Sequence, residues 1–143
     1  MSHTYKFDTP SIPIDAGIIQ FFEEFYRISD TPDAHETYID QFTPDATFIL
    51  ASKVSNGTNE IKTTREGMWA HVKARKHTVR KIFPFGPNSQ EVMIYGSVGY
   101  DLKNGKHADV DWAGRAVLVK SESDHRWRMS FYQIYLDTAP ANT

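Results

Sequence analysis

The sequence predicts a single α+β domain, with helices in its first half and a sheet of long strands in its second half. Apolar residues recur at helical spacing in the first half, and the second half holds long segments rich in β-branched and aromatic residues. The length of 143 residues fits one compact domain. We therefore expect one domain over residues 1–143, with an ordered core at about 13–138 and helices that cover one face of the sheet.

The first predicted helix spans residues 15–29. Its apolar side chains recur every three or four residues, while Glu23, Glu24 and Arg27 fall on the other side. This spacing predicts an amphipathic helix with an aromatic inner face, made by Ile18, Ile19, Phe22, Phe25 and Tyr26.

Two shorter helices are expected before the sheet. Thr31-Pro32 predicts the start of a helix that ends near Gln41, because threonine caps helix starts and proline is tolerated in the first turn. A third helix follows Gly57, and its start is ambiguous between Thr58 and the capping-box pattern at Thr63. Its inward side chains are expected to be Ile61, Met68, Trp69 and Val72.

The strands are predicted from apolar and β-branched runs that end in turn-forming residues. Residues 46–51 form a short apolar run typical of a buried strand. Among the turns, Asn104-Gly105 is the strongest, because a tight hairpin favours these two residues in left-handed conformations. The long strands are expected at residues 77–85, 91–102, 107–119 and 127–136.

Composition and motifs exclude several function classes. A net charge of −2 and an isoelectric point near 6.3 give no general attraction to nucleic acid or to anionic membranes. The absence of cysteine excludes disulfides, thiolate metal sites and a cysteine nucleophile. No signal peptide or membrane-spanning run is present, which predicts a cytoplasmic protein. Phosphate-loop, catalytic-serine and zinc motifs are also missing, so we expect neither nucleotide binding nor activated-serine chemistry.

Short strings along the chain resemble one known group of proteins. The order of predicted elements and these strings resemble SnoaL-like members of the NTF2-like superfamily found in fungi, over about residues 15–137. The strings are Arg65-Glu66-Gly67-Met68-Trp69, Arg75-Lys76-His77, Asp111-Trp112-Ala113-Gly114-Arg115 and Phe131-Tyr132-Gln133-Ile134-Tyr135-Leu136-Asp137.

The resemblance implies a cone: a curved mixed or antiparallel sheet wrapped around the three helices, with an interior pocket. It implies a range of functions, from polyketide and terpenoid cyclases, isomerases, dehydratases and epoxide hydrolases to members that bind ligands or partners without catalysis. Such enzymes typically use carboxylates, histidine and tyrosine without a cofactor. The resemblance also implies a homodimer formed through the outer face of the sheet.

His77 is the first candidate catalytic residue. By position it is similar to the histidine that relatives of scytalone dehydratase direct into the cavity, and an imidazole can move a proton near neutral pH. The alternative is a structural or exposed histidine at a strand start. The neighbouring strand has no second histidine, and its polar candidates are Tyr95 and Tyr100.

The strand at residues 107–119 places polar and apolar residues on opposite faces. His107, Asp109, Asp111 and Arg115 alternate with apolar and small residues. If the polar face lines the cavity, Asp111 or Asp109 could remove a proton next to a carbonyl, and Arg115 could stabilise the resulting oxyanion. If it faces outward, it forms a salt-bridged surface or a dimer contact. A shared metal ion is disfavoured, because residues two apart on a strand lie nearly 7 Å apart.

Aromatic residues are the candidates for substrate binding. Trp69, Phe22, Tyr26 and Tyr135 could form an apolar wall around a ring system, although each is also explained as ordinary core. A tyrosine hydroxyl could donate a hydrogen bond to a developing enolate. Arg75 could guard the pocket mouth, or could belong to a solvated basic cluster.

Two functions are therefore carried forward. The first is a cofactor-independent isomerase, cyclase or dehydratase of polyketide or terpenoid secondary metabolism, acting by proton transfer on an apolar polycyclic or carbonyl-bearing natural product. The second is a non-catalytic homodimer that binds a small molecule or a protein partner. A filled interior favours the second, and a perturbed titratable group inside a cavity favours the first.

Overall fold

The computed structural model describes residues 5–139, which form a six-stranded mixed sheet and three helices. The strand order is β2-β1-β6-β5-β4-β3, and β1 and β6 are parallel while the other neighbours are antiparallel. The elements are α1 (Ala16–Ser29), α2 (His35–Ile39), β1 (Phe42–Leu50), β2 (Lys53–Asn56), α3 (Gly57–Gly67), β3 (Val72–Pro84), β4 (Glu91–Leu102), β5 (His107–Lys120) and β6 (Trp127–Leu136).

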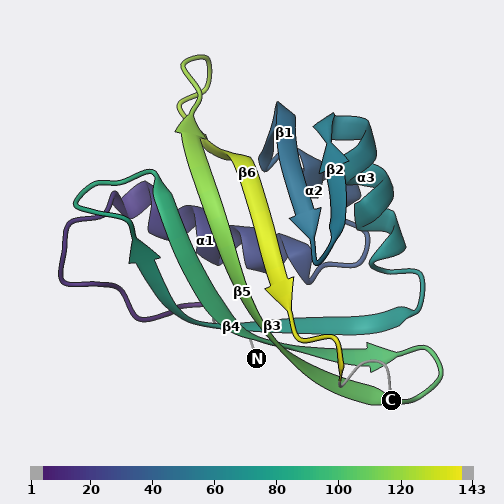
Figure 1. Ribbon diagram of the computed structural model, residues 1–143. Helices are drawn as coiled ribbons and strands as arrows, with labels where there is room; N and C mark the ends of the chain where they lie inside the picture. Colours follow the sequence, from purple (N-terminus) through teal and green to yellow (C-terminus); the bar gives the residue numbers. More distant parts are fainter. Residues whose placement is uncertain (1–4, 140–143) are drawn as a thin grey trace.

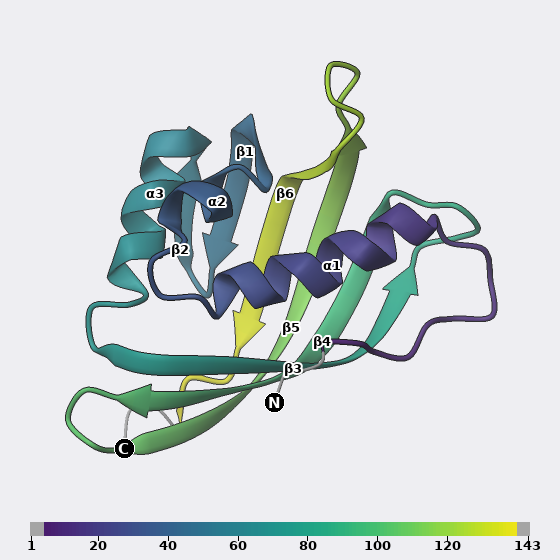
Figure 2. The same cartoon turned by 180° about the vertical axis from the view of Figure 1, so that it is seen from behind.

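The sheet is strongly curved, and the helices pack against it. Figures 1 and 2 show α1 crossing one face of the sheet, α2 and α3 beside β1 and β2, and the strands β3 to β5 bending beneath α1. The expected α+β cone with a curved mixed sheet is confirmed. None of the helices within residues 5–139 is long and apolar enough to cross a bilayer.

Helix α1 supplies the centre of the core. The Asp15 carboxylate accepts a hydrogen bond from the Gly17 N–H at 2.7 Å and caps the helix start. Four residues of the predicted inner face are buried, whereas Ile19 is half-buried and Phe21, which was not predicted, is buried. The Phe25 ring packs against the rings of Tyr38 and Tyr132 at centroid distances of 5.4 Å. These contacts fix α1 against the sheet, and they therefore fix the position of Asp30, the residue that follows its last turn.

Several elements differ from the sequence expectation. Strand β1 begins at Phe42 rather than at residue 46, and α3 ends at Gly67, so the predicted inward residues Met68, Trp69 and Val72 lie beyond the helix. Helix α2 begins at His35 rather than at Thr31, because the Thr31 hydroxyl bonds back to the Arg27 carbonyl and helps to close α1. The polar strand β2 was not expected, because its sequence has no apolar pattern. It is held in place by backbone pairing with β1. Strand β3 begins at Val72, because the basic run before His77 pairs with the end of β4.

The N-terminal segment adds one more contact to the sheet. The Asp8 N–H donates to the Arg80 carbonyl at 2.9 Å, and Asp8 forms a bridge with Lys81. This contact therefore lies before residue 13, where the ordered core was expected to begin. Residues 1–4 and 140–143 of the two tails lie outside the described residues.

Gly96 allows β3 and β4 to approach closely. A Cβ atom at this position would lie 2.0 Å from the Thr78 carbonyl oxygen, beside a register shift in β3. We expect Gly96→Ala to lower the free energy of unfolding by about 2–3 kcal/mol, because backbone must move to relieve the clash. Urea denaturation measures the loss. Gly67→Ala is the control, since no heavy atom lies within 4 Å of its Cβ position, and an equal loss in both variants would contradict the explanation.

Candidate functional site

The interior pocket lies between α1 and the inner face of the sheet. Its volume of about 40 Å³ accommodates a few water molecules at most, whereas drug-sized ligands occupy pockets of about 300 Å³ or more. A polycyclic guest therefore needs side-chain movement to enter. The polar and aromatic residues in the lining include Tyr26, Arg75, His77, Tyr100, Trp112 and Tyr132.

His77 and Asp30 form a hydrogen-bonded pair at the pocket wall. Their side chains are only 14% and 5% exposed, and His77 Nδ1 lies 2.6 Å from an Asp30 carboxylate oxygen. An ionised carboxylate can only accept, so Nδ1 carries a hydrogen, and in the neutral imidazole the lone pair is on Nε2. A histidine oriented in this way by a carboxylate has the arrangement of a general base.

Asp30 is held by two further donors. It is the C-cap of α1, where the negative end of the helix dipole disfavours a carboxylate. The backbone N–H of His77 and the Tyr5 hydroxyl each donate to Asp30 Oδ2 at 2.8 Å, and these bonds offset that cost. Burial and the contact with Asp30 raise the pKa of Tyr5 well above its ordinary value, so its hydroxyl remains a donor.

Two tyrosines place a hydroxyl pair in the same pocket. The Tyr26 and Tyr132 hydroxyl oxygens lie 2.7 Å apart and are buried, and the Tyr26 ring centroid is 5.0 Å from that of His77. One hydroxyl donates to the other, which leaves the second with a hydrogen to donate. Burial raises the pKa of both tyrosines well above the ordinary value, so both stay protonated at neutral pH.

The candidates on β5 and β4 do not join His77. The predicted alternation along β5 is confirmed. However, the apolar residues, such as Val110, Trp112 and Leu118, face inward, and the polar residues face outward. Arg115 pairs with Glu91 at 2.8 Å, and Tyr95 is 37% exposed. The expectation of one cavity that holds His77 and this polar face is therefore wrong, and Asp109, Asp111, Arg115 and Tyr95 lie on the outer face.

The four aromatic candidates for substrate binding separate into three groups. Tyr26 lines the pocket. Phe22 is fully buried in the core, and Trp69 lies beside Arg65 and Arg75. Neither of them lines the pocket. Tyr135 is 49% exposed on the outer face, which contradicts its predicted role.

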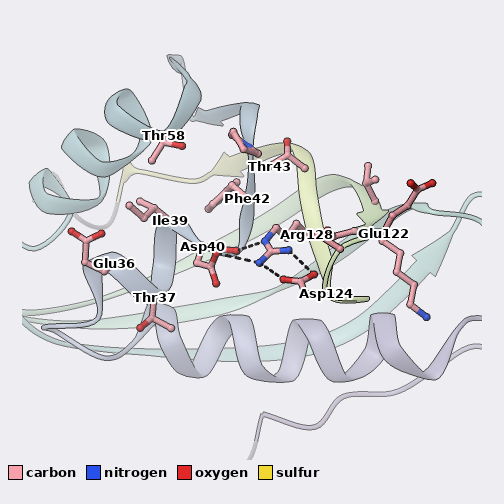
Figure 3. A pocket seen from close by; sticks show the side chains of 15 residues that line it. Glu36, Thr37, Ile39, Asp40, Phe42, Thr43, Thr58, Glu122, Asp124 and Arg128 are labelled. Carbon is pink, nitrogen blue, oxygen red and sulfur yellow. Dashed lines mark hydrogen bonds and ion pairs between the residues drawn. The ribbon is translucent and has the colours of Figure 1, made fainter.

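A larger groove of about 1190 Å³ opens between α2, the start of β1 and the β5–β6 hairpin. Figure 3 shows the Arg128 guanidinium between the carboxylates of Asp40 and Asp124, at 3.2 and 2.9 Å. The Arg128 hydrogen bond holds the pKa of Asp124 well below its usual range. These charged groups already satisfy one another, so the groove centre is a surface ion-pair network rather than a set of available catalytic groups.

Sequence reasoning found His77 and missed Asp30. Asp30 comes directly after the aromatic helix, and its only sequence signal is an acidic residue at a helix end where acidic residues are unfavourable. Between residues 5 and 139, no group of three or more histidine and acidic side chains is arranged to hold a metal ion.

Comparisons with known proteins locate the fold. Neither a protein-family profile nor a curated protein matches the chain. A solved Novosphingobium aromaticivorans protein, provisionally described as a scytalone dehydratase, has a TM-score of 0.74 at 15% identity over 84% of this chain and 81% of its own. A Jannaschia protein, provisionally described as a SnoaL-like polyketide cyclase, has 0.70 at 12% over 94% and 98%. Nuclear transport factor 2 from Cryptosporidium parvum has 0.66 at 12% over 82% and 90%.

Proposed function

This chain has the NTF2-like cone fold, and on that premise we propose that it is a cofactor-independent enzyme that moves a proton at a carbon next to a carbonyl group. The observation that supports the proposal is the buried His77–Asp30 pair, with a 2.6 Å hydrogen bond at the wall of the interior pocket. A carboxylate that orients an imidazole and stabilises its charged form is a recurring general-base arrangement.

The proposed step needs one base and one set of donors. His77 Nε2 takes the proton, the C–H bonding electrons form an enolate, and Asp30 stabilises the imidazolium. Donors for the enolate oxygen are the free hydroxyl hydrogen of the Tyr26–Tyr132 pair and the Trp112 indole N–H. The Trp112 Nε1 atom is buried without a partner among residues 5–139. If the enolate is conjugated with a C=C bond, return of the proton from the His77 imidazolium to the far end of that system completes an isomerisation. If the carbon next to the enolate carries a hydroxyl group, this group leaves with the imidazolium proton as water, and the new C=C bond completes a dehydration.

The pocket volume restricts the substrate to a small molecule. Of the two substrate kinds that the sequence suggests, a small carbonyl compound suits a 40 Å³ pocket better than a polycyclic one. Deuterium exchange tests the proposal without knowledge of the product. The protein in D₂O is expected to accelerate deuterium incorporation beside the carbonyl in a panel of small ketones and oxo acids, read by NMR. A panel without any acceleration would refute the proposal.

A second candidate, a non-catalytic homodimer, is favoured by the small cavity and by apolar side chains on the outer face. Phe83, Met93, Tyr95 and Tyr135 are between 37% and 51% exposed there, and the rings of Phe83 and Tyr95 stack with centroids 6.0 Å apart. Exposed apolar groups gathered on one face are typical of protein–protein contacts. A second copy of the chain, docked by the same face, is the proposed occupant.

The dimer is tested by a charge placed on the outer face. We expect Met93→Asp to convert the protein from dimer to monomer in sedimentation velocity, because an apolar contact cannot accommodate an unpaired carboxylate. Val54→Asp is the matched control, because Val54 is 53% exposed on the edge strand β2, which β1, β6 and β5 separate from β4 in the sheet. A wild-type monomer, or a Met93→Asp dimer, would contradict the proposed contact.

A further inference from the structure

Arg75 is a buried cation without a carboxylate partner. It is 7% exposed, and its Nη2 donates to the Met68 carbonyl at 2.6 Å. Its Nη1 atom is buried and has no hydrogen-bond partner within residues 5–139, and none of the ion pairs in that range includes it. Because buried charges are normally paired, this guanidinium requires a different explanation.

The other buried arginine shows what a structural guanidinium looks like here. Arg65 is fully buried, and its nitrogens donate to the carbonyls of Ser29 and Thr31 at 2.7 and 2.6 Å. These carbonyls end α1, where the helix dipole is negative, so Arg65 has a partner. Arg75 also contacts a helix end, because Met68 is the C-cap of α3. It differs from Arg65 in that it lines the interior pocket and that its second nitrogen, Nη1, has no partner within residues 5–139.

The charged groups nearest to Arg75 do not neutralise it. The Tyr100 hydroxyl interacts with Arg75, but burial raises the pKa of Tyr100, so this hydroxyl carries no negative charge at neutral pH. Asp30 acts on Arg75 from a distance and is engaged by His77 and Tyr5. Arg65 is a second cation that acts on the same carboxylate. Two buried guanidinium groups thus share one buried carboxylate, and the pocket retains a positive charge.

Two rings hold the guanidinium in place. The Arg75 Cζ atom lies 4.6 Å from the Trp69 ring centroid and 5.2 Å from that of Tyr100, which stands opposite Arg75 on β4. Arg75 and His77 lie two residues apart on the inner face of β3, hence about 7 Å apart along the strand. That spacing suits a small molecule that carries an anionic group at one end and a reacting carbon at the other.

We propose that Arg75 binds the carboxylate of a small oxo acid, whose carbon beside the carbonyl faces His77. The planar guanidinium matches a carboxylate through paired N–H···O bonds, and Nη1 is available for them. This inference rests on the proposed function, because it names the substrate class for the same pocket.

The probes are 2-oxobutanoate and its neutral amide, 2-oxobutanamide, which have nearly the same shape. We expect the acid to bind the wild-type protein at least about tenfold more tightly than the amide, and to shift the Arg75 side-chain N–H signals in NMR titrations. Equal affinity for acid and amide would overturn the assignment of a carboxylate site, and no variant is needed for this comparison.

Variants locate the binding group. Arg75→Met is expected to weaken binding of 2-oxobutanoate at least about tenfold. The thermal midpoint is expected to change little, because removal of an unbalanced buried charge offsets loss of the donor to the Met68 carbonyl. Arg75→Lys retains the charge and is expected to weaken binding less than methionine does. Arg115→Met is the matched control on the outer face and should bind as the wild type does. Unchanged binding by Arg75→Met would overturn the proposal.

The two proposals fail separately. His77→Gln is expected to bind 2-oxobutanoate but to lose deuterium exchange. If wild-type protein binds the acid through Arg75 and shows no exchange, the proposed function fails while the binding site stands. If wild type and Arg75→Met both catalyse exchange, and the exchange rate depends on substrate concentration in the same way in both, the Arg75 inference fails while the proposed function stands.

Discussion

Replacing His77 by glutamine is expected to lower the rate of deuterium incorporation by about 10²–10⁴-fold, the usual contribution of a general base. Glutamine can still donate a hydrogen bond to Asp30, so the local structure is preserved while the basic nitrogen is lost. The exchange rate at saturating oxo acid or ketone is the measurement. His107→Gln is the control, because His107 is an exposed histidine that also contacts two aspartates, at 2.8 and 2.9 Å.

Asp30, the carboxylate partner of His77, allows a second test of the same general base, again by the rate of deuterium exchange. Asp30→Asn is expected to slow exchange by about 10²-fold, because an amide cannot stabilise the imidazolium formed when His77 takes the proton. Asp33→Asn, on the exposed stretch after α1, is the control. A full exchange rate in Asp30→Asn together with an inactive His77→Gln would show that the histidine works without its carboxylate.

The largest effect on stability is expected from Arg65→Met, which should lower the free energy of unfolding by about 3 kcal/mol. Methionine fills part of the space between the rings of Tyr38 and Trp69, but it leaves the carbonyl of the buried Ser29, the last residue of α1, without its donor. The Thr31 carbonyl loses one donor and keeps the Ala34 N–H. Each buried carbonyl without a donor costs about 1–3 kcal/mol. Urea denaturation followed by circular dichroism gives the value.

A surface arginine on α1, the helix whose end Arg65 contacts, supplies the comparison. Arg27 forms an ion pair with Glu24 within one turn of α1 and its side chain is 56% exposed. Arg27→Met is expected to change the unfolding free energy by no more than about 0.5 kcal/mol. If the two variants lose equal stability, Arg65 does not stabilise the end of α1 through its hydrogen bonds.

Much of the fold follows from periodicity. The spacing of Phe22 and Tyr26 predicts α1 within one residue of its start. Asn104-Gly105 predicts the position of the turn between β4 and β5, but the connection is longer than two residues, and Gly105 has a positive φ whereas Asn104 does not. The missed strand β2 has no apolar period, because its pairing with β1 uses backbone groups that side chains do not report.

The site was less predictable, because a strand pattern gives two faces without saying which one turns inward. On β5 the apolar face turns inward, because burial of Trp112 and Leu118 is favourable whereas burial of the Asp109 and Asp111 carboxylates is costly. Asp30 and His77 are 47 residues apart in the chain, and their contact depends on where the end of α1 lies against β3. Local sequence spacing carries no information about that distance.

Alternation along β3 and β4 has a consequence for engineering. Arg75, His77 and Tyr100 belong to the pocket, while Phe83, Met93 and Tyr95 on the same two strands face the opposite side. Libraries that vary substrate preference and libraries that vary self-association can therefore be built at separate codons and recombined, with little expected interference between the two traits.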